Sequence, residues 1–360
     1  MSKFKVGSAC SAILLLLAAI MFVGRRGATP PIKDDNGKVV PGSIASLEKV
    51  QLGGIEQWIL IRGQDASNPI LLWLHGGPGA AQMPVARTFN GDLEKVFVVV
   101  HWDQRGAGKS NAPDFDEQTM TLQQFIDDAH ELTLYLKTRF HREKIYLVGH
   151  SWGAQLGIKV AQAYPEDYYA YVGVGQVVAP ALSQEVGRAW LLAQIEEKGD
   201  EKNLEGLQAL GAPPYMGQDD YVTYARMIDA YGGDFDVDMG KLFWIALRAP
   251  EYTAGDLLAA FRGMNRGSGP MWGSDEYQSY NTIEDIPQLR LPVYFFNGRH
   301  DYITPLQVTQ HYFELLEAPE GKKLVIFEQS AHTPFMAEAE KFNRELISVK
   351  QATLLKQSQR

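Results

Sequence analysis

Three residues of the types that activate a hydroxyl group stand far apart in this sequence. Ser151 lies between two glycines in G-H-S-W-G (149–153), directly after an apolar run, and Asp301 and His332 each follow a later apolar run. A serine hydroxyl becomes a nucleophile when a base removes its proton and an acid orients that base. The pattern therefore predicts nucleophilic catalysis, with Ser151 as nucleophile, His332 as base and Asp301 as orienting acid.

Each of these residues also has a purely structural interpretation. Ser151 could be a turn residue, Asp301 could cap a helix that begins near Pro305, and His332 could be an ordinary loop histidine. Their order along the chain, with each one after a predicted strand, is the order of an α/β-hydrolase. The carboxyl ends of parallel strands meet at one edge of a sheet, where open α/β folds place their sites. The joint occurrence favours catalysis.

An acyl-transfer site also needs donors for the developing oxyanion. The loop H-G-G-P-G (75–79) follows the first predicted central strand, so the Gly77 amide is a candidate donor and the Trp152 amide is the second. A simple Gly-Pro turn is the alternative for this loop. In the next strand end (101–110), we expect Asp103 and Arg105 to brace loops and not to react.

Strands and helices alternate around these residues. A Gly53-Gly54 hairpin joins 47–51 to 55–62, and near-continuous apolar strands separated by helices indicate a parallel sheet covered on both faces. The prediction is an α/β fold, specifically the α/β-hydrolase fold, with a mostly parallel sheet flanked by helices and an inserted helical cap. The predicted strands are 69–77, 96–106, 144–151, 168–178, 291–301 and 322–332, and the predicted helices are 121–140, 152–164, 306–316 and 338–349.

The same patterns divide the chain. Pro and Gly punctuate a stretch after the N-terminal apolar run, the strand–helix rhythm breaks after Pro180, and it resumes near Pro287. The predicted parts are a transmembrane anchor or signal segment (1–24), an exposed linker (25–44), the first part of the core (45–180), a helical cap (181–286), the second part of the core (287–350) and a frayed polar tail (351–360).

The N-terminus carries a membrane signal. Residues 6–24, V-G-S-A-C-S-A-I-L-L-L-L-A-A-I-M-F-V-G, hold no charge. Such a run suits a membrane-spanning helix, and a cleaved secretory signal would need a small-x-small cleavage site that is missing here. We expect an uncleaved anchor, with the secreted or periplasmic form after cleavage as the alternative. Basic residues flank both ends, so the positive-inside rule does not fix the orientation; we expect an extracytoplasmic catalytic domain.

Composition excludes several classes. The formal net charge is −9 and no basic run is longer than a pair such as Arg25-Arg26, which argues against a nucleic-acid partner. The single cysteine, Cys10, allows no intrachain disulfide. We find no spacing of cysteines or histidines that is typical of zinc and expect no metal. The oligomeric state stays open.

Over roughly residues 45–345, the sequence resembles the proline iminopeptidase (prolyl aminopeptidase) branch of the α/β-hydrolases. Four motifs carry the resemblance: L-H-G-G-P-G, W-D-Q-R-G-A-G-K-S, G-H-S-W-G-A-Q-L-G and N-G-R-H-D. The resemblance implies a triad of Ser151, Asp301 and His332, oxyanion donors at Gly77 and Trp152, and neither metal nor organic cofactor. Two features depart from the branch. Its members usually carry Gly-Gly-Ser-Trp-Gly at the turn, whereas His150 precedes the serine here.

The second departure concerns the cap. The family binds the substrate's free amino group with cap glutamates in an aromatic context, which has no clear counterpart here; Glu251 and Trp244 are the candidate substrate-binding residues. The expected function is a serine hydrolase that acts through an acyl-enzyme on a small peptide, amide or ester, as an aminopeptidase of the proline iminopeptidase type. A membrane-tethered esterase, lactonase or amidase is the alternative. A catalytically inactive binding module is a third, disfavoured because no triad member is missing.

Overall fold

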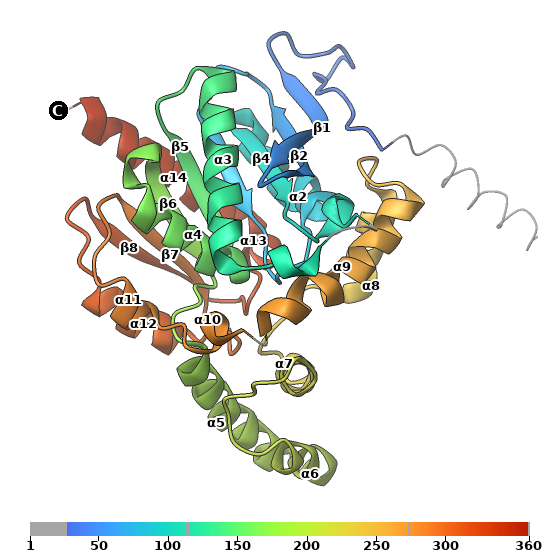
Figure 1. The fold of residues 1–360 in the computed structure, drawn as a ribbon, viewed down its shortest axis with the longest axis vertical. Helices are drawn as coiled ribbons and strands as arrows, with labels where there is room; N and C mark the ends of the chain where they lie inside the picture. Colours follow the sequence, from blue (N-terminus) through green and yellow to red (C-terminus); the bar gives the residue numbers. More distant parts are fainter. Residues whose placement is uncertain (1–26, 113–115, 273, 359–360) are drawn as a thin grey trace, which may run out of the picture.

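The computed structural model describes residues 27–112, 116–272 and 274–358, and its centre is an eight-stranded sheet (Figure 1). The strand order is β1-β2-β4-β3-β5-β6-β7-β8, in which β2 runs antiparallel to both of its neighbours and all later pairs are parallel. The strands are β1 (Ile44–Leu52), β2 (Ile55–Gly63), β3 (Ile70–Leu74), β4 (Val98–Asp103), β5 (Ile145–His150), β6 (Tyr168–Val174), β7 (Val293–Gly298) and β8 (Lys322–Phe327).

Helices follow most of the strands, which confirms the predicted alternation and the mostly parallel sheet. The predicted cap on the helix over 121–140 is confirmed as well, because the Thr121 side chain accepts a hydrogen bond from the Gln124 amide. The α-helices are α2 (Met83–Asn90), α3 (Leu122–Phe140), α4 (Trp152–Ala163), α5 (Pro180–Lys198), α6 (Glu201–Ala209), α7 (Gln218–Ala230), α8 (Met239–Arg248), α9 (Ala254–Trp272), α10 (Asp275–Gln278), α11 (Thr282–Asp285), α12 (Leu306–Leu315), α13 (Pro334–Ala337) and α14 (Ala339–Ser358).

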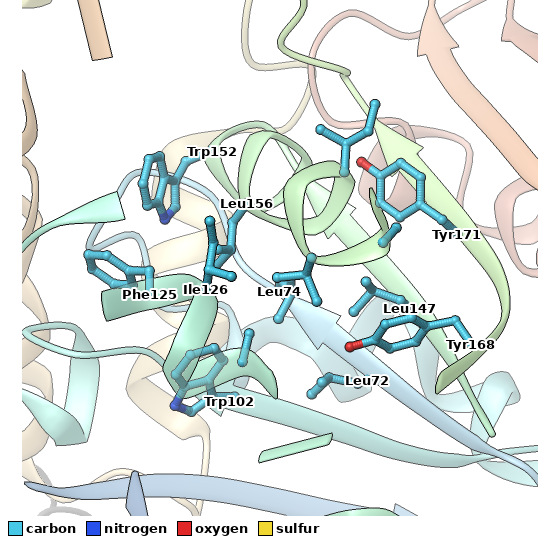
Figure 2. Close-up of a cluster of buried hydrophobic side chains, with 14 of the residues drawn as sticks. Leu72, Leu74, Trp102, Phe125, Ile126, Leu147, Trp152, Leu156, Tyr168 and Tyr171 are labelled. Atoms are coloured by element: carbon cyan, nitrogen blue, oxygen red, sulfur yellow. The ribbon is translucent and has the colours of Figure 1, made fainter. Parts of the chain in front are cut away.

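The sheet is buried on both faces because its central strands are apolar at almost every position. In β3, Leu72 and Leu74 point to the face covered by α3 and α4, where they join Phe125 and Leu156 (Figure 2). Trp73 points to the opposite face and packs edge-on against Phe335 and in a tilted arrangement against Phe342. Two layers of side chains therefore hold the strand ends in place.

The region predicted as a cap contains helices α5 to α11 between β6 and β7. Helices α5 to α7 extend away from the sheet and bury a small cluster of their own (Figure 1). That cluster contains Leu191, Ile195, Leu207, Tyr224 and Ile228.

Two predicted segments differ in the structure. The predicted linker (25–44) is exposed over residues 33–39, but its first described residues are packed on the body: Arg62 donates to Thr29 Oγ1 and the Pro30 carbonyl at 2.5 and 2.7 Å, and Ile32 is buried. The tail was expected to fray at residue 351, but α14 continues to Ser358. Thr353 is buried there with its hydroxyl 2.6 Å from the Tyr146 hydroxyl, so a tertiary hydrogen bond holds the end of the chain in the helix.

The predicted anchor or signal at 1–24 lies outside the described residues. Among the helices that the structure does describe, none combines the length and the apolar character that a membrane crossing requires.

Candidate active site

Ser151 occupies a sharp turn between β5 and α4. Its backbone has φ 55° and ψ −119°, a conformation that non-glycine residues adopt only when the surrounding structure imposes it. The turn is possible because both flanking glycines are tightly enclosed. A Cβ on Gly149 would lie 2.1 Å from the Gly153 carbonyl oxygen, and one on Gly153 would lie 2.2 Å from the Leu74 carbonyl oxygen. The strained turn thus fits the prediction that Ser151, in G-H-S-W-G, is a nucleophile at a strand-to-helix junction.

Gly77 and Trp152, which come from two different segments, line the cavity next to Ser151. Trp152 is the first residue of α4, so its N–H has no acceptor within its own helix. Gly77, with φ +113°, lines the same cavity as Ser151 and Trp152. The positive end of the α4 dipole also favours negative charge at this point. These are the positions at which the sequence predicted the oxyanion donors.

Asp301 and His332 meet at the same edge of the sheet. Asp301 is fully buried, and its Oδ2 lies 2.8 Å from His332 Nδ1. Its other oxygen accepts from the Ile303 and Thr304 amides at 3.0 and 2.8 Å, and Oδ2 also accepts from the Thr304 hydroxyl at 2.6 Å. The residue at the N-cap of α12 is Pro305, so Asp301 holds its loop and faces the histidine, and it is not the N-cap of that helix.

The His332 ring lies beside the serine turn. The Ser151 amide donates to the Val174 carbonyl at 2.9 Å, and a Cβ on the following residue, Gly175, would lie 3.0 Å from His332 Cε1. The ring centroids of His150 and His332 are 4.9 Å apart. The three residues that sequence reasoning selected are therefore brought together at the carboxyl edge of the sheet.

His332 carries an altered pKa. Burial lowers the pKa of its imidazole, but the charge and hydrogen bond of Asp301, together with Asp234 and Asp236, outweigh burial and raise it to about 9. Burial also raises the pKa of Asp234 to about 7, against the opposing effect of His332. The site therefore holds more negative charge around the imidazole than the predicted triad alone supplies.

The two extra carboxyl groups come from a loop of the cap (232–238), which sequence reasoning missed. This loop clamps the strand-end loops that carry the triad: the Tyr302 amide donates to the Gly233 carbonyl at 2.9 Å, and the His332 amide donates to the Asp234 carbonyl at 2.9 Å. The Asp236 carboxylate accepts from the Ala331 amide. The run D-F-D-V-D (234–238) was the available signal, but an acidic run by itself predicts a solvated surface.

His150, the departure from the branch pattern, belongs to a buried chain of hydrogen bonds. The Trp73 indole donates to Gln82 Oε1 at 2.7 Å, so the Gln82 amide nitrogen must be the donor to His150 Nδ1 at 2.9 Å. His150 Nε2 then carries the proton and donates to the His332 carbonyl at 2.9 Å. Burial, and then the neighbouring His332, keep the pKa of His150 well below its ordinary value, so its ring stays neutral.

A cavity of about 70 Å³ opens above the serine. Gln155 lies one turn along α4 from Ser151 and is buried, and neither atom of its side-chain amide has a hydrogen-bond partner in the described part of the chain. The residues that line the cavity all have uncharged side chains. They are Gly77, Ser151, Trp152, Gln155, Val177, Pro180, Ser183, Gln184, Tyr221, Tyr277, Ile303 and Thr304.

The predicted substrate-binding residues lie elsewhere. Glu251 is buried, but its carboxylate is 3.1 Å from the Arg87 guanidinium and accepts from the Thr29 hydroxyl at 2.9 Å. Trp244 is 52% exposed on α8. Neither is among the residues that line the cavity above Ser151, so the structure does not bring them to the nucleophile.

The bracing role of Asp103 and Arg105 is confirmed. Arg105 forms a buried ion pair with Asp128 at 2.9 Å and donates to the Gly53 carbonyl at 3.0 Å. Asp103 accepts from the Lys109 amide at 2.8 Å and from the Tyr252 hydroxyl. Within the described ranges, no group of three His, Cys, Asp or Glu residues is arranged to hold a metal ion.

This fold and this site define a class. Residues 71–345 match the alpha/beta hydrolase family, and the chain belongs to that family. The chain is also 34% identical, over 305 residues, to the probable aminopeptidase YbaC of Bacillus subtilis (strain 168), a match that covers 83% of this chain and 94% of that protein. The proline iminopeptidase of Heyndrickxia coagulans is 25% identical over 288 residues, covering 76% of this chain and 87% of that protein.

Solved structures agree on the fold. The proline iminopeptidase of Mycobacterium smegmatis superposes with a TM-score of 0.60 at 22% identity, over 86% of this chain and 99% of that one. The esterase RhEst1 from Rhodococcus superposes with a TM-score of 0.56 at 15% identity, over 85% and 98%. The family and the sequence relatives make the chain an enzyme of the hydrolase class and confirm the resemblance to the proline iminopeptidase branch.

Proposed function

We propose that the chain is a serine hydrolase that forms an acyl-enzyme on Ser151 and acts as an aminopeptidase of the proline iminopeptidase type. The observation that carries the proposal is the buried pair of His332 and Asp301, 2.8 Å apart, beside the strained turn of Ser151. A base held by an acid next to a serine in such a turn is the arrangement that makes a hydroxyl nucleophilic.

In the proposed reaction, His332 Nε2 takes the Ser151 proton as Oγ attacks the substrate carbonyl. The Gly77 and Trp152 amides donate to the resulting oxyanion, and each such donor contributes about 3 kcal/mol in comparable enzymes. Asp301 accepts from Nδ1 and stabilises the imidazolium. His332 then protonates the leaving amine, and a water molecule, deprotonated by the same histidine, hydrolyses the acyl-enzyme.

The aminopeptidase assignment draws on the relatives and on the cap loop. An aminopeptidase binds a substrate whose amino group is positively charged, so it needs negative charge near the acyl pocket. Asp234 is buried and its main-chain carbonyl accepts from the His332 amide at 2.9 Å, so its carboxyl group adds to the negative charge near the imidazole, although it is not among the residues that line the cavity above Ser151. We assign it the role of attracting the substrate ammonium group.

A second function is favoured by one observation. The cavity above Ser151 is lined by uncharged residues only, among them the unpaired Gln155, which suits a neutral acyl group. An esterase or amidase for uncharged substrates would use the same triad and oxyanion donors without any need for Asp234.

One panel separates these functions. The full chain is assayed with proline anilide and other aminoacyl anilides and, in parallel, with short acyl esters. Ser151→Ala should abolish turnover of all of them while the melting temperature is retained. Asp234→Asn should lower the ratio of kcat/KM for the anilides to kcat/KM for the esters by about tenfold or more, since the accompanying change in the His332 pKa affects both kinds of substrate and a charge–charge attraction is lost only with the cationic one. Equal losses would favour the neutral-substrate function, and undiminished hydrolysis by Ser151→Ala would overturn both.

We also propose that residues 6–24 anchor the enzyme in a membrane, with the catalytic domain on the extracytoplasmic side. The support is the uncharged apolar sequence and the missing cleavage site. Protease added to cells from which any outer membrane has been removed should then digest the catalytic domain, whereas complete protection while the inner membrane is intact would place it on the cytoplasmic side.

A further inference from the structure

Helices α8 and α9 expose large apolar side chains that a water-soluble surface does not require. Phe261 is 71% exposed, Phe243 62% and Trp244 52%. Single exposed apolar residues are ordinary, but three on α8 and at least two on the next helix, α9, point to an interaction region. We call this group the apolar face; it consists of Met239, Phe243, Trp244, Leu258 and Phe261.

The described chain begins at this face. The Ala28 amide donates to the Pro250 carbonyl at 3.2 Å, and a Cβ on Gly27 would lie 3.3 Å from Thr253 Cγ2. Pro250 and Thr253 belong to the five-residue connection between α8 and α9, and Figure 1 shows the start of the described chain beside these helices. The described chain therefore starts next to the connection between α8 and α9, the two helices that carry the apolar face.

Only a short stretch of chain joins the apolar N-terminal sequence to the first described residue. As a helix, residues 6–24 would be about 28 Å long at 1.5 Å per residue, close to the roughly 30 Å of a bilayer core. Only Arg25 and Arg26 separate this segment from Gly27, and so short a stretch reaches about 10 Å at most. If the segment spans a bilayer, the connection between α8 and α9 must lie at the bilayer surface.

We propose that the apolar face docks on the surface of a lipid bilayer that carries anionic headgroups, next to the N-terminal anchor. The inference rests on the proposed anchor and adds to it a fixed orientation of the catalytic body. Aromatic and aliphatic side chains beside basic residues are the composition that lies at the interface of a membrane.

The charges of the face fit that partner. Lys241, Arg248 and Arg262 are exposed on α8 and α9, and the Arg248 guanidinium lies over the Trp244 ring at 5.8 Å. The acidic groups that follow α8 are neutralised within the body: Asp256 is paired with Lys109 at 2.6 Å, as Glu251 is with Arg87. Asp238, at the N-cap of α8, is exposed and acidic, but with three exposed basic residues on these helices anionic headgroups meet a surface whose exposed charges are mainly basic.

A lipid bilayer is a better partner for the apolar face than residues 6–24 of the same chain would be. Residues 6–24 are apolar without a polar stripe, and a helix that is apolar all round belongs inside a bilayer or a large core. A segment folded back over α8 and α9 would leave its outer side in water.

The opposite side of α9 packs on the oxyanion loop. The Gly263 carbonyl oxygen lies 2.4 Å from the position of a Cβ on Gly79, and Asn111 Nδ2 donates to the Ala259 carbonyl at 2.9 Å. Docking would therefore place the loop that carries Gly77 one helix thickness away from the lipid surface.

The test uses the full chain with Cys10→Ser, so that an introduced cysteine is the single thiol. A polarity-sensitive dye is attached at Phe261→Cys on the apolar face and, as the matched control, at Leu315→Cys on α12, which is 53% exposed and lies on another part of the surface. The protein is reconstituted in vesicles of phosphatidylcholine and phosphatidylglycerol. Emission and quenching by a lipid-borne nitroxide are measured, and flotation with the vesicles is scored separately.

Docking predicts a blue-shifted emission and several-fold greater lipid quenching at position 261 than at 315, reduced when phosphatidylglycerol is omitted. Equal, weak quenching at both positions in protein that floats would overturn docking and leave the anchor in place. A blue shift without lipid quenching would also overturn it, in favour of a second copy of the chain or of the folded-back segment. Protein that fails to float would overturn both proposals, and hydrolysis of the anilide or ester panel reports on the active site independently.

Discussion

The edge of the sheet and the cap differ in how tightly they are packed and in what they contribute to the site. At the edge, β5 is buried at every residue and the serine turn is enclosed so tightly that neither flanking glycine has room for a Cβ. In the cap, α6 and α7 close over one small cluster, and a Cβ on Gly206 of α6 would meet, among the described residues, only a methyl group of Met227 within 4 Å. The edge fixes the reacting groups, whereas the cap contributes charge and shape around them.

The difference shows how one fold can keep its chemistry while its substrates change. Ser151, Asp301 and His332 stand on strand ends held from both faces by the core. The 232–238 loop of the cap accepts hydrogen bonds from the His332 and Tyr302 amides, and its carboxyl groups raise the pKa of the imidazole. Other cap residues, such as Ser183 and Tyr221, line the cavity above Ser151. Substitutions at the edge should therefore remove activity, and substitutions in the cap should adjust it.

The largest expected effect is that of Asp301→Asn. The asparagine oxygen can still accept from the Ile303 and Thr304 amides, but the carboxylate that fixes His332 is lost. We expect kcat to fall by about 10⁴, as in other enzymes with this triad, with little change in melting temperature. Asp238→Asn in the cap is the control. The Asp238 side chain accepts a hydrogen bond from the Lys241 amide at the N-cap of α8, and asparagine can do so as well as aspartate. A loss of less than about tenfold in Asp301→Asn would contradict the proposed role.

The next prediction compares the effect on stability of replacing two helical glycines. Gly153→Ala on α4 forces a Cβ to 2.2 Å from the Leu74 backbone, so we expect a loss of at least about 3 kcal/mol in the free energy of unfolding, or failure to fold. Gly206→Ala on α6 has room for its methyl group and should gain about 0.5–1 kcal/mol from helix propensity. Urea unfolding measures both variants. Similar changes in the two would mean that the edge is no more constrained than the cap.

A smaller effect is expected from the hydrogen-bond chain behind His150. Gln82→Met removes the donor to His150 Nδ1 and leaves the ring free to turn away from the His332 carbonyl. We expect kcat to fall about tenfold at constant KM, which corresponds to about 1.4 kcal/mol in the transition state. Trp73→Phe removes only the far end of the chain and should have less effect. A loss of stability with kcat unchanged would show that the chain only supports the fold.

The smallest effect concerns the cap carboxyl groups and pH. His332 must be neutral to act as base, and its raised pKa means that kcat/KM should rise with pH toward about 9. Asp236→Asn keeps an acceptor for the Ala331 amide but removes a negative charge that raises the His332 pKa. The rising limb of the pH profile should therefore move toward acid pH. An unchanged or alkaline-shifted limb would contradict the assigned electrostatics.

Local patterns in the sequence predicted the parts of the molecule that local forces decide. The apolar runs indicated the strands, Thr121 marked the start of α3, and the glycines at 149 and 153 marked the serine turn. The positions of Asp301 and His332 followed from strand order, because parallel strands end at the same edge.

Contacts between distant segments could not be predicted in this way. Gln82 is 68 residues from His150, and Asp234 meets His332 only because the cap folds back over the sheet edge. Gln155 carries no signal beyond its helical position, and its place in the cavity depends on the cap residues opposite it. The end of α14 is held by Tyr146, which belongs to a strand far earlier in the chain.

The central claim is that Ser151 is made nucleophilic by His332 and Asp301. The most direct measurement is reaction of the full chain with a fluorophosphonate, followed by peptide mass spectrometry to locate the phosphonyl group. We expect a single adduct on Ser151, which forms at a greatly reduced rate in His332→Ala. An adduct on another residue, or labelling of Ser151 at the same rate without His332, would contradict it.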